Sequence, residues 1–143
     1  MTLEQLEQEL PNGLHDAQIL SIKRSFEEES LILEVRILVG LPDNPPETRS
    51  EYRKAVITFT GVKLFIVESP DASSAFLAPG GVWFSAGRSE PGTFSPELEE
   101  KLGFSADSYS LFILDWQSSI HIAASDVSFA WNPDSTFQKE RPL

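Results

Sequence analysis

The two histidines are the side chains of this sequence best suited to acid–base chemistry. His15 directly precedes Asp16 within LPNGLHDAQILSI, residues 10–22. A histidine–carboxylate pair can act as a general base with its orienting group, or as two metal ligands. Neighbouring side chains on a strand point to opposite faces, so these two are not expected to hydrogen-bond to each other. We therefore predict a structural corner after the Asn12–Gly13 turn, with Asp16 as the structural residue accepting bonds from backbone amides.

His121 lies in the alternating run IHIAA, residues 120–124, where the small Ala123 leaves room for a pocket around the imidazole. Trp83 and Trp116 have rings that can stack on a ligand held there. We therefore name His121, Trp83 and Trp116 as candidate ligand-binding residues. The competing interpretation is that the tryptophans belong to the core and the histidine to a strand surface.

The sequence gives little further support for catalysis or metal chemistry. It has no cysteine, which excludes thiolate catalysis and Cys-based zinc sites. A histidine metal site needs a third ligand such as Asp16, Asp115 or Asp126, and no ligand spacing supports one. No serine lies in a Gly-x-Ser-x-Gly context, and the glycine-rich residues 80–88 lack the Lys-Ser/Thr of a phosphate loop. We expect no metal, no cofactor and, on balance, no enzymatic activity.

Charge narrows the class of partner. The 143 residues include 22 acidic and 11 basic side chains, for a net charge of −11. Such a surface repels nucleic acid and anionic lipid, whereas a basic protein or a neutral ligand remains compatible with it. No apolar run approaches the roughly 20 residues that span a bilayer, and the acidic start is unlike a secretory leader. We therefore expect a cytoplasmic protein that binds neither nucleic acid nor membrane.

Apolar periodicity predicts a single α+β, mainly β domain over residues 1–143. Thr2 and Gln5 have capping-box spacing, which predicts a short helix over residues 2–10. Ser95 followed by Pro96 predicts a second short helix, residues 96–102. We expect about seven strands, drawn from the alternating or apolar runs at residues 17–26, 31–39, 52–59, 62–68, 82–84, 111–116, 120–124 and 127–131.

These strands follow one another without helical crossovers, which favours antiparallel pairing in a sandwich or half-barrel. The run LFILDW, residues 111–116, is apolar on both faces and is typical of a covered central strand. The residues expected to be largely buried are Leu33, Val35, Ile37, Val56, Ile57, Phe65, Ile113 and Ile120.

Three segments resemble a group of small bacterial proteins: LHDAQILSI (residues 14–22), YRKAVITFTGV (52–62) and LDWQSSIHIAASDVSFAW (114–131). Some proteins of this kind resemble immunity proteins of polymorphic toxin systems. The resemblance covers about a quarter of the chain and implies no catalytic residue and no cofactor. Together with the acidic composition, it leads us to expect a non-enzymatic binding protein whose acidic surface meets a basic partner such as a toxin. The alternative is a small-ligand-binding β domain with its pocket near Trp83, Trp116 and His121.

Overall fold

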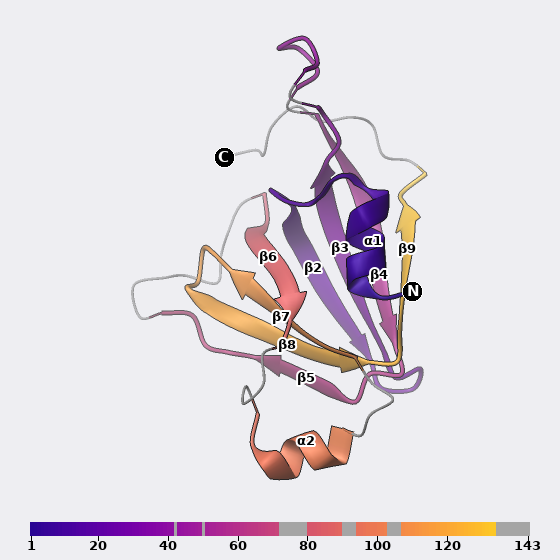
Figure 1. Ribbon diagram of the computed structural model, residues 1–143, viewed down its shortest axis with the longest axis vertical. Coiled ribbons are helices and arrows are strands. Elements are labelled where there is room, and N and C mark those ends of the chain that lie inside the picture. The colour runs from indigo at the N-terminus through magenta and orange to yellow at the C-terminus, as the bar shows by residue number, and fades with distance from the viewer. Residues whose placement is uncertain (42, 50, 72–79, 90–93, 103–106, 134–143) are drawn as a thin grey trace.

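The computed structural model describes residues 1–41, 43–49, 51–71, 80–89, 94–102 and 107–133. These residues form a mainly β fold with two short helices (Figure 1). The elements, in chain order, are α1 (Leu3–Glu9), β1 (Pro11–Leu14), β2 (Gln18–Ser25), β3 (Ser30–Leu38), β4 (Tyr52–Thr60), β5 (Leu64–Val67), β6 (Val82–Arg88), α2 (Pro96–Leu102), β7 (Asp107–Ile113), β8 (Ser118–Ala124) and β9 (Asp126–Trp131).

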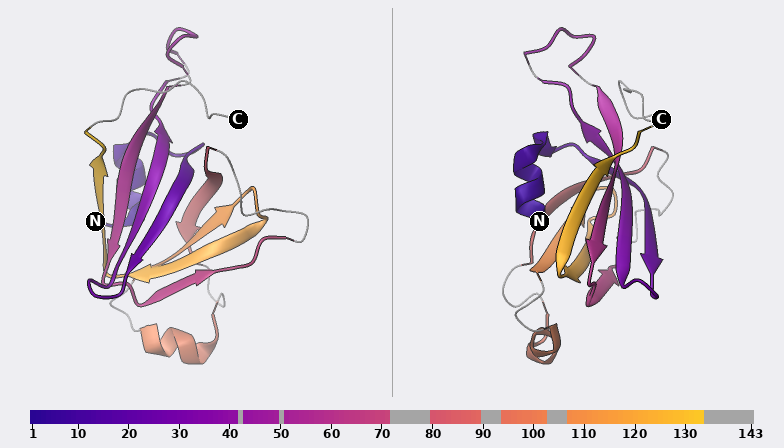
Figure 2. Two further views of the ribbon diagram at one scale, coloured as in Figure 1. Left: turned by 180° about the vertical axis from the view of Figure 1, so that it is seen from behind. Right: turned by 90° about the vertical axis from the view of Figure 1, so that its right-hand side faces the viewer.

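Eight of these strands form one open antiparallel sheet in the order β5-β8-β7-β6-β2-β3-β4-β9. The sheet has one strand more than the approximate count expected, and its antiparallel pairing is as predicted. The two ends of the sheet run at a steep angle to each other (Figure 2). One connected core of buried apolar side chains receives residues from both ends and from α1.

The bend lies where β2 meets β6. The pairing between them has only two registered pairs, Gln18 with Trp83 and Ile19 with Val82. The register of β2 against β3 also shifts between Ile19 and Ser21, which is the signature of a β-bulge. Gly81 precedes β6 with φ of 90°, a backbone conformation that side-chain-bearing residues rarely adopt. The bulge and this glycine let the chain turn one half of the sheet against the other.

Helix α1 is held at its start and along one face. Thr2 is the N-cap, and its reciprocal hydrogen bonds with Gln5 form the predicted capping box. Leu3 and Leu6 are buried against the sheet. The backbone N–H of Leu3 also donates to the Tyr109 hydroxyl on β7 at 3.2 Å. Burial raises the pKa of Tyr109, so the hydroxyl remains a neutral acceptor for the helix start.

Most of the predicted core is confirmed, with two exceptions. Leu33, Val35, Ile37, Ile57, Ile113 and Ile120 are at most 1% exposed. Val56 and Phe65 are only partly buried. Val56 alternates with the buried residues of β4 and so faces the other side of the sheet, and Phe65 lies on the edge strand β5.

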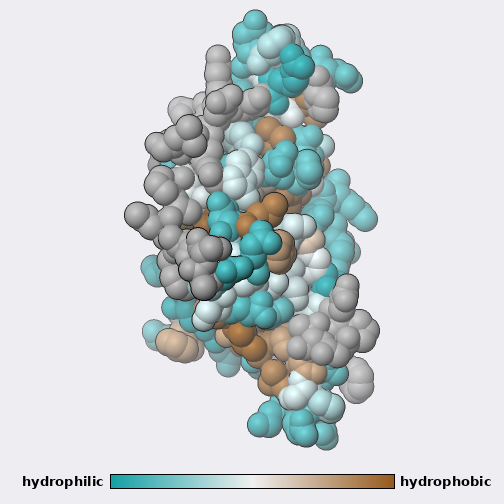
Figure 3. All heavy atoms as spheres, turned by 90° about the vertical axis from the view of Figure 1, so that its left-hand side faces the viewer, coloured by the Kyte–Doolittle hydropathy of each residue, from teal (hydrophilic) through white to brown (hydrophobic). Residues whose placement is uncertain are grey.

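The covered strand predicted for residues 111–116 is wrong in its second half. Strand β7 ends at Ile113, and the chain turns there through Trp116 and Gln117, whose N–H groups donate to the Ile113 carbonyl. Leu114 is consequently 49% exposed. Hydrophilic residues occupy much of the surface seen in Figure 3, with smaller apolar areas between them. Within the residues described, no helix has the length and apolar character needed to cross a membrane.

Candidate functional site

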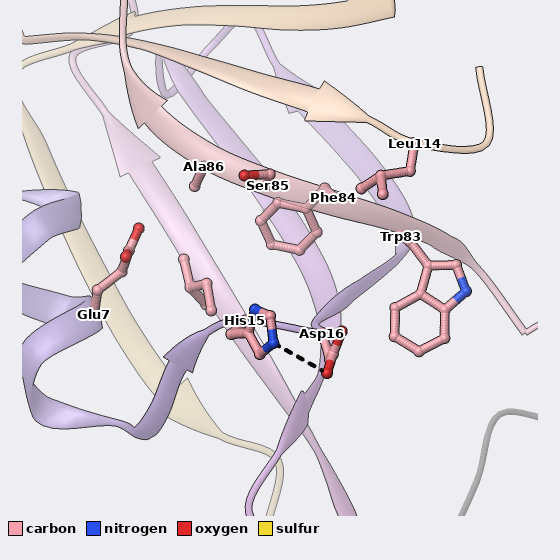
Figure 4. A pocket seen from close by; sticks show the side chains of 9 residues that line it. Glu7, His15, Asp16, Trp83, Phe84, Ser85, Ala86 and Leu114 are labelled. Carbon is pink, nitrogen blue, oxygen red and sulfur yellow. Dashed lines mark ion pairs between the residues drawn. The ribbon is translucent and has the colours of Figure 1, made fainter. Parts of the chain in front are cut away.

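A groove of about 500 Å³ lies between α1, the turn after β1, and β6. Figure 4 shows β6 along its floor, Glu7 at one end and Trp83 at the other, with His15 and Asp16 on the facing side. The groove is lined by Glu7, Leu14, His15, Asp16, Trp83, Phe84, Ser85, Ala86 and Leu114. It therefore combines two carboxylates with an apolar and aromatic surface, and the described residues that line it include neither lysine nor arginine.

Glu7 is the least compensated charged group of the groove. It is half-buried on α1, and its carboxylate makes no hydrogen bond or ion pair within the described part of the chain. Burial, with a smaller contribution from the negative charge of Glu4, raises the pKa of Glu7. The partly buried position therefore disfavours the charged form of Glu7. Groups with such perturbed pKa values are more common at binding sites than on ordinary surfaces.

The structure corrects the predicted geometry of His15 and Asp16. The two residues lie in a turn rather than on a strand, and the N–H of Ala17 donates to the Leu14 carbonyl across it at 3.2 Å. Their side chains therefore meet, with His15 Nε2 3.4 Å from Asp16 Oδ2. No backbone amide of the described residues donates to the Asp16 carboxylate. With 81% and 50% of their side chains exposed, the two groups form a solvated pair at the groove mouth.

Asp16 contributes to the turn through its backbone. Its φ is 59°, in the left-handed region that aspartate tolerates better than alanine and that glycine adopts freely. We expect Asp16→Ala to lower the free energy of unfolding by about 1 kcal/mol and Asp16→Gly to leave it equal or slightly higher. His15→Gln should cost under about 1 kcal/mol because the imidazole is exposed. Urea unfolding of the three variants checks this, and equal losses for Ala and Gly would point instead to a lost side-chain bond.

The aromatic end of the groove is fixed from both sides. The backbone N–H of Trp83 donates to the Asp115 carboxylate at 2.7 Å. The Trp83 ring packs edge-on against Tyr52, with the ring centroids 6.5 Å apart. Leu114 presents its half-exposed side chain beside this ring, as Figure 4 shows. An apolar or planar group entering this end would meet a surface that is already ordered.

The three predicted ligand-binding residues are not brought together. Trp83 lines the main groove. Trp116 is buried and lines a second, smaller cavity of about 190 Å³ at the bend of the sheet, together with Gly81 and Ile120. His121 lines neither of these two cavities. The alternation of residues along each strand determines which face of the sheet a side chain occupies. It does not determine how far that side chain lies from residues on other strands.

His121 is instead the centre of a polar chain across β7 and β8. Its Nδ1 lies 2.8 Å from the Ser110 hydroxyl, and its Nε2 lies 3.4 Å from the Glu68 carboxylate. The Ser110 hydroxyl is also hydrogen-bonded to the Ser89 hydroxyl, at 2.9 Å. The His121 side chain is 11% exposed, and its ring packs edge-on against Phe94. Nδ1 thus has a hydrogen-bond partner, and Nε2 faces a carboxylate, so the buried histidine has a polar group beside each ring nitrogen.

The sequence reasoning missed Glu7 and Leu114. Glu7 is four residues after Leu3 and three before Leu10, so it borders the buried stripe of α1. This helical spacing could have predicted its partial burial. Leu114 was assigned to a strand interior. No motif marks either residue as part of a site, because the groove forms only where α1 meets β6.

The residues that the structure describes contain no group of three His, Asp or Glu side chains placed to hold a metal ion. The chain matches no protein-family model, and a search of curated proteins finds no match. The fold and the groove thus define the class of the molecule as an antiparallel β-sheet protein with an acidic, aromatic-lined groove beside its N-terminal helix.

Proposed function

We propose that this protein is a non-enzymatic binding protein whose acidic groove receives a basic segment of a protein partner, in the manner of an immunity protein. The groove itself supports this most directly. Two carboxylates border a surface of Trp83, Phe84 and Leu114, and no lysine or arginine is among the described residues of the lining. Interfaces of this type combine an aromatic anchor with charges that complement the partner.

The distribution of charge supports the same proposal. Helix α1 carries Glu4, Glu7 and Glu9 and no basic residue, and it forms one wall of the groove. The net charge of −11 extends this negative field over the molecule, which favours encounter with a cationic partner. A toxin with a basic surface is the partner class that the sequence resemblance suggests.

The test is affinity capture from the source organism followed by reconstitution with the purified captured protein. A double variant, Glu7→Gln with Asp16→Asn, removes two groove charges while asparagine preserves the left-handed turn. The matched control, Glu97→Gln with Glu100→Gln, makes the same charge change on α2, which lies beyond β5 in Figure 1. A captured basic protein that loses affinity for the groove variant alone supports the proposal. Equal binding by both variants contradicts it.

Salt dependence of the reconstituted complex is a separate prediction. Raising the salt concentration from about 0.1 M to about 1 M shortens the screening length from about 10 Å to about 3 Å. We expect the affinity to fall over this range, chiefly through a slower association rate measured by surface plasmon resonance. An affinity that is independent of salt would indicate an apolar interface.

A neutral small ligand is the second candidate. The groove volume of about 500 Å³ falls within the range of about 300–1,000 Å³ that is typical of ligand pockets. Trp83 provides a ring on which such a ligand can stack. This candidate predicts binding that does not change with salt or with the charge of Glu7, so the two experiments above separate it from the first.

A further inference from the structure

We propose that Glu7 is the specificity-determining residue of the groove and that it anchors an arginine side chain of the partner. This inference rests on the proposed function and assigns the chemistry by which the groove selects its occupant. It makes one side chain of this protein responsible for the preference for a guanidinium group.

The carboxylate of Glu7 has no compensating partner among the described residues. A half-buried carboxylate without a hydrogen-bond or ion-pair partner is less favourable than the same group in water. The neighbouring Glu4, in contrast, is paired with Arg88, whose Nε lies 2.6 Å from its Oε1. Arg88 also contacts Asp107 at 2.9 Å, so this cation is already engaged by two carboxylates. Among the described residues nothing neutralises Glu7, which leaves its carboxylate available to a cation of another molecule.

A guanidinium group suits this site better than other cations do. A guanidinium is planar and weakly hydrated, so it enters a partly apolar space more readily than an ammonium group. It can also form two parallel hydrogen bonds to one carboxylate. The floor beside Glu7 is formed by Ala86 and Phe84 of β6, which suit the methylene stem of arginine (Figure 4). A metal ion is disfavoured because no set of three ligands surrounds Glu7 in the described chain.

Glu7 also reduces the stability of the folded protein at neutral pH. Because the pKa of Glu7 is raised on folding, its charged form lowers the free energy of unfolding at pH values above its folded-state pKa. This penalty is absent below the unfolded-state pKa, where the carboxyl is protonated in both states. Glu7→Gln should therefore be more stable than the wild-type protein at neutral pH and equal to it in acid. A residue that reduces stability in this way is typical of a binding site.

The experiment titrates the whole protein with N-acetyl-arginine amide and with its neutral counterpart N-acetyl-citrulline amide. Carbon-detected NMR follows the Glu7 carboxyl, and methyl spectra follow Ala86 and Leu114. We expect a saturable shift with the arginine probe, a fall in the pKa of Glu7 in its presence, and binding at least about tenfold weaker for citrulline. The shift at Ala86 should disappear in Glu7→Gln and persist in Glu97→Gln.

Equal shifts with both probes, or an arginine shift at Ala86 that persists in Glu7→Gln, would overturn the inference. The proposed function is judged separately with the captured basic protein. If that protein loses affinity for the double variant but not for Glu7→Gln alone, the groove binds the partner and the role of Glu7 is wrong. If no basic protein depends on the groove while the arginine probe still requires Glu7, the partner class is wrong and the guanidinium site stands.

Discussion

Gly81→Ala is expected to lower the free energy of unfolding by at least about 2 kcal/mol. At a φ of 90° an alanine is strained wherever it is placed. A Cβ at this position would also lie 2.6 Å from the Ile19 carbonyl oxygen and 2.9 Å from Leu20. The contact is with backbone on β2, so relief requires that β6 move away from the short junction on which the bend of the sheet depends. Urea unfolding measures the loss.

The control for this prediction is Gly87→Ala at the other end of the same strand. A Cβ there meets no atom within 4 Å, and the backbone is not left-handed. We expect this variant to unfold within about 0.5 kcal/mol of the wild-type protein. If both alanine variants lost the same stability, β6 would be sensitive to any added side chain, and the loss could not be assigned to its junction with β2.

Leu6→Ala is expected to cost about 2–5 kcal/mol. Leu6 is fully buried and is the central apolar contact of the seven-residue helix α1. A helix of this length does not persist in water without packing, so the loss of this contact should detach α1 from the sheet. The groove would lose its Glu7 wall, and binding of the basic partner should fall together with stability. Chemical unfolding and binding are measured on the same samples.

Leu41→Ala makes the same substitution on a leucine that is 44% exposed. It should change the free energy of unfolding by less than about 0.5 kcal/mol and leave partner binding intact. If Leu6→Ala proved equally mild, the helix would be held by its cap and by the contacts of Leu3, and the proposed dependence of the groove on α1 packing would be wrong.

His15 and Asp16 illustrate how far local rules reach. The sequence predicted a corner here, and His15 and Asp16 do form a turn, but Asn12 and Gly13 lie in strand β1 just before it and not in a turn of their own. The prediction also assigned His15 and Asp16 to a strand, and it was therefore wrong about the orientation of the two side chains. The positive φ of Asp16 brings the imidazole and carboxylate together, and no pattern of residue types announces that angle.

Local chemistry determined the elements of this protein. The capping box of Thr2 and Gln5 fixed the start of α1, and apolar residues at every second position fixed one buried face of β3. These signals involve residues that are close in the chain, so they can be recognised without the fold. Glu7 and Trp83 are 76 positions apart and share a groove only because the bulge in β2 and the left-handed Gly81 turn β6 toward α1. Only the tertiary structure decided that these two residues share a groove, because the bend depends on pairing between strands that are far apart in the sequence. Periodicity specifies which face of a strand is buried, but it does not specify which strand lies beside it.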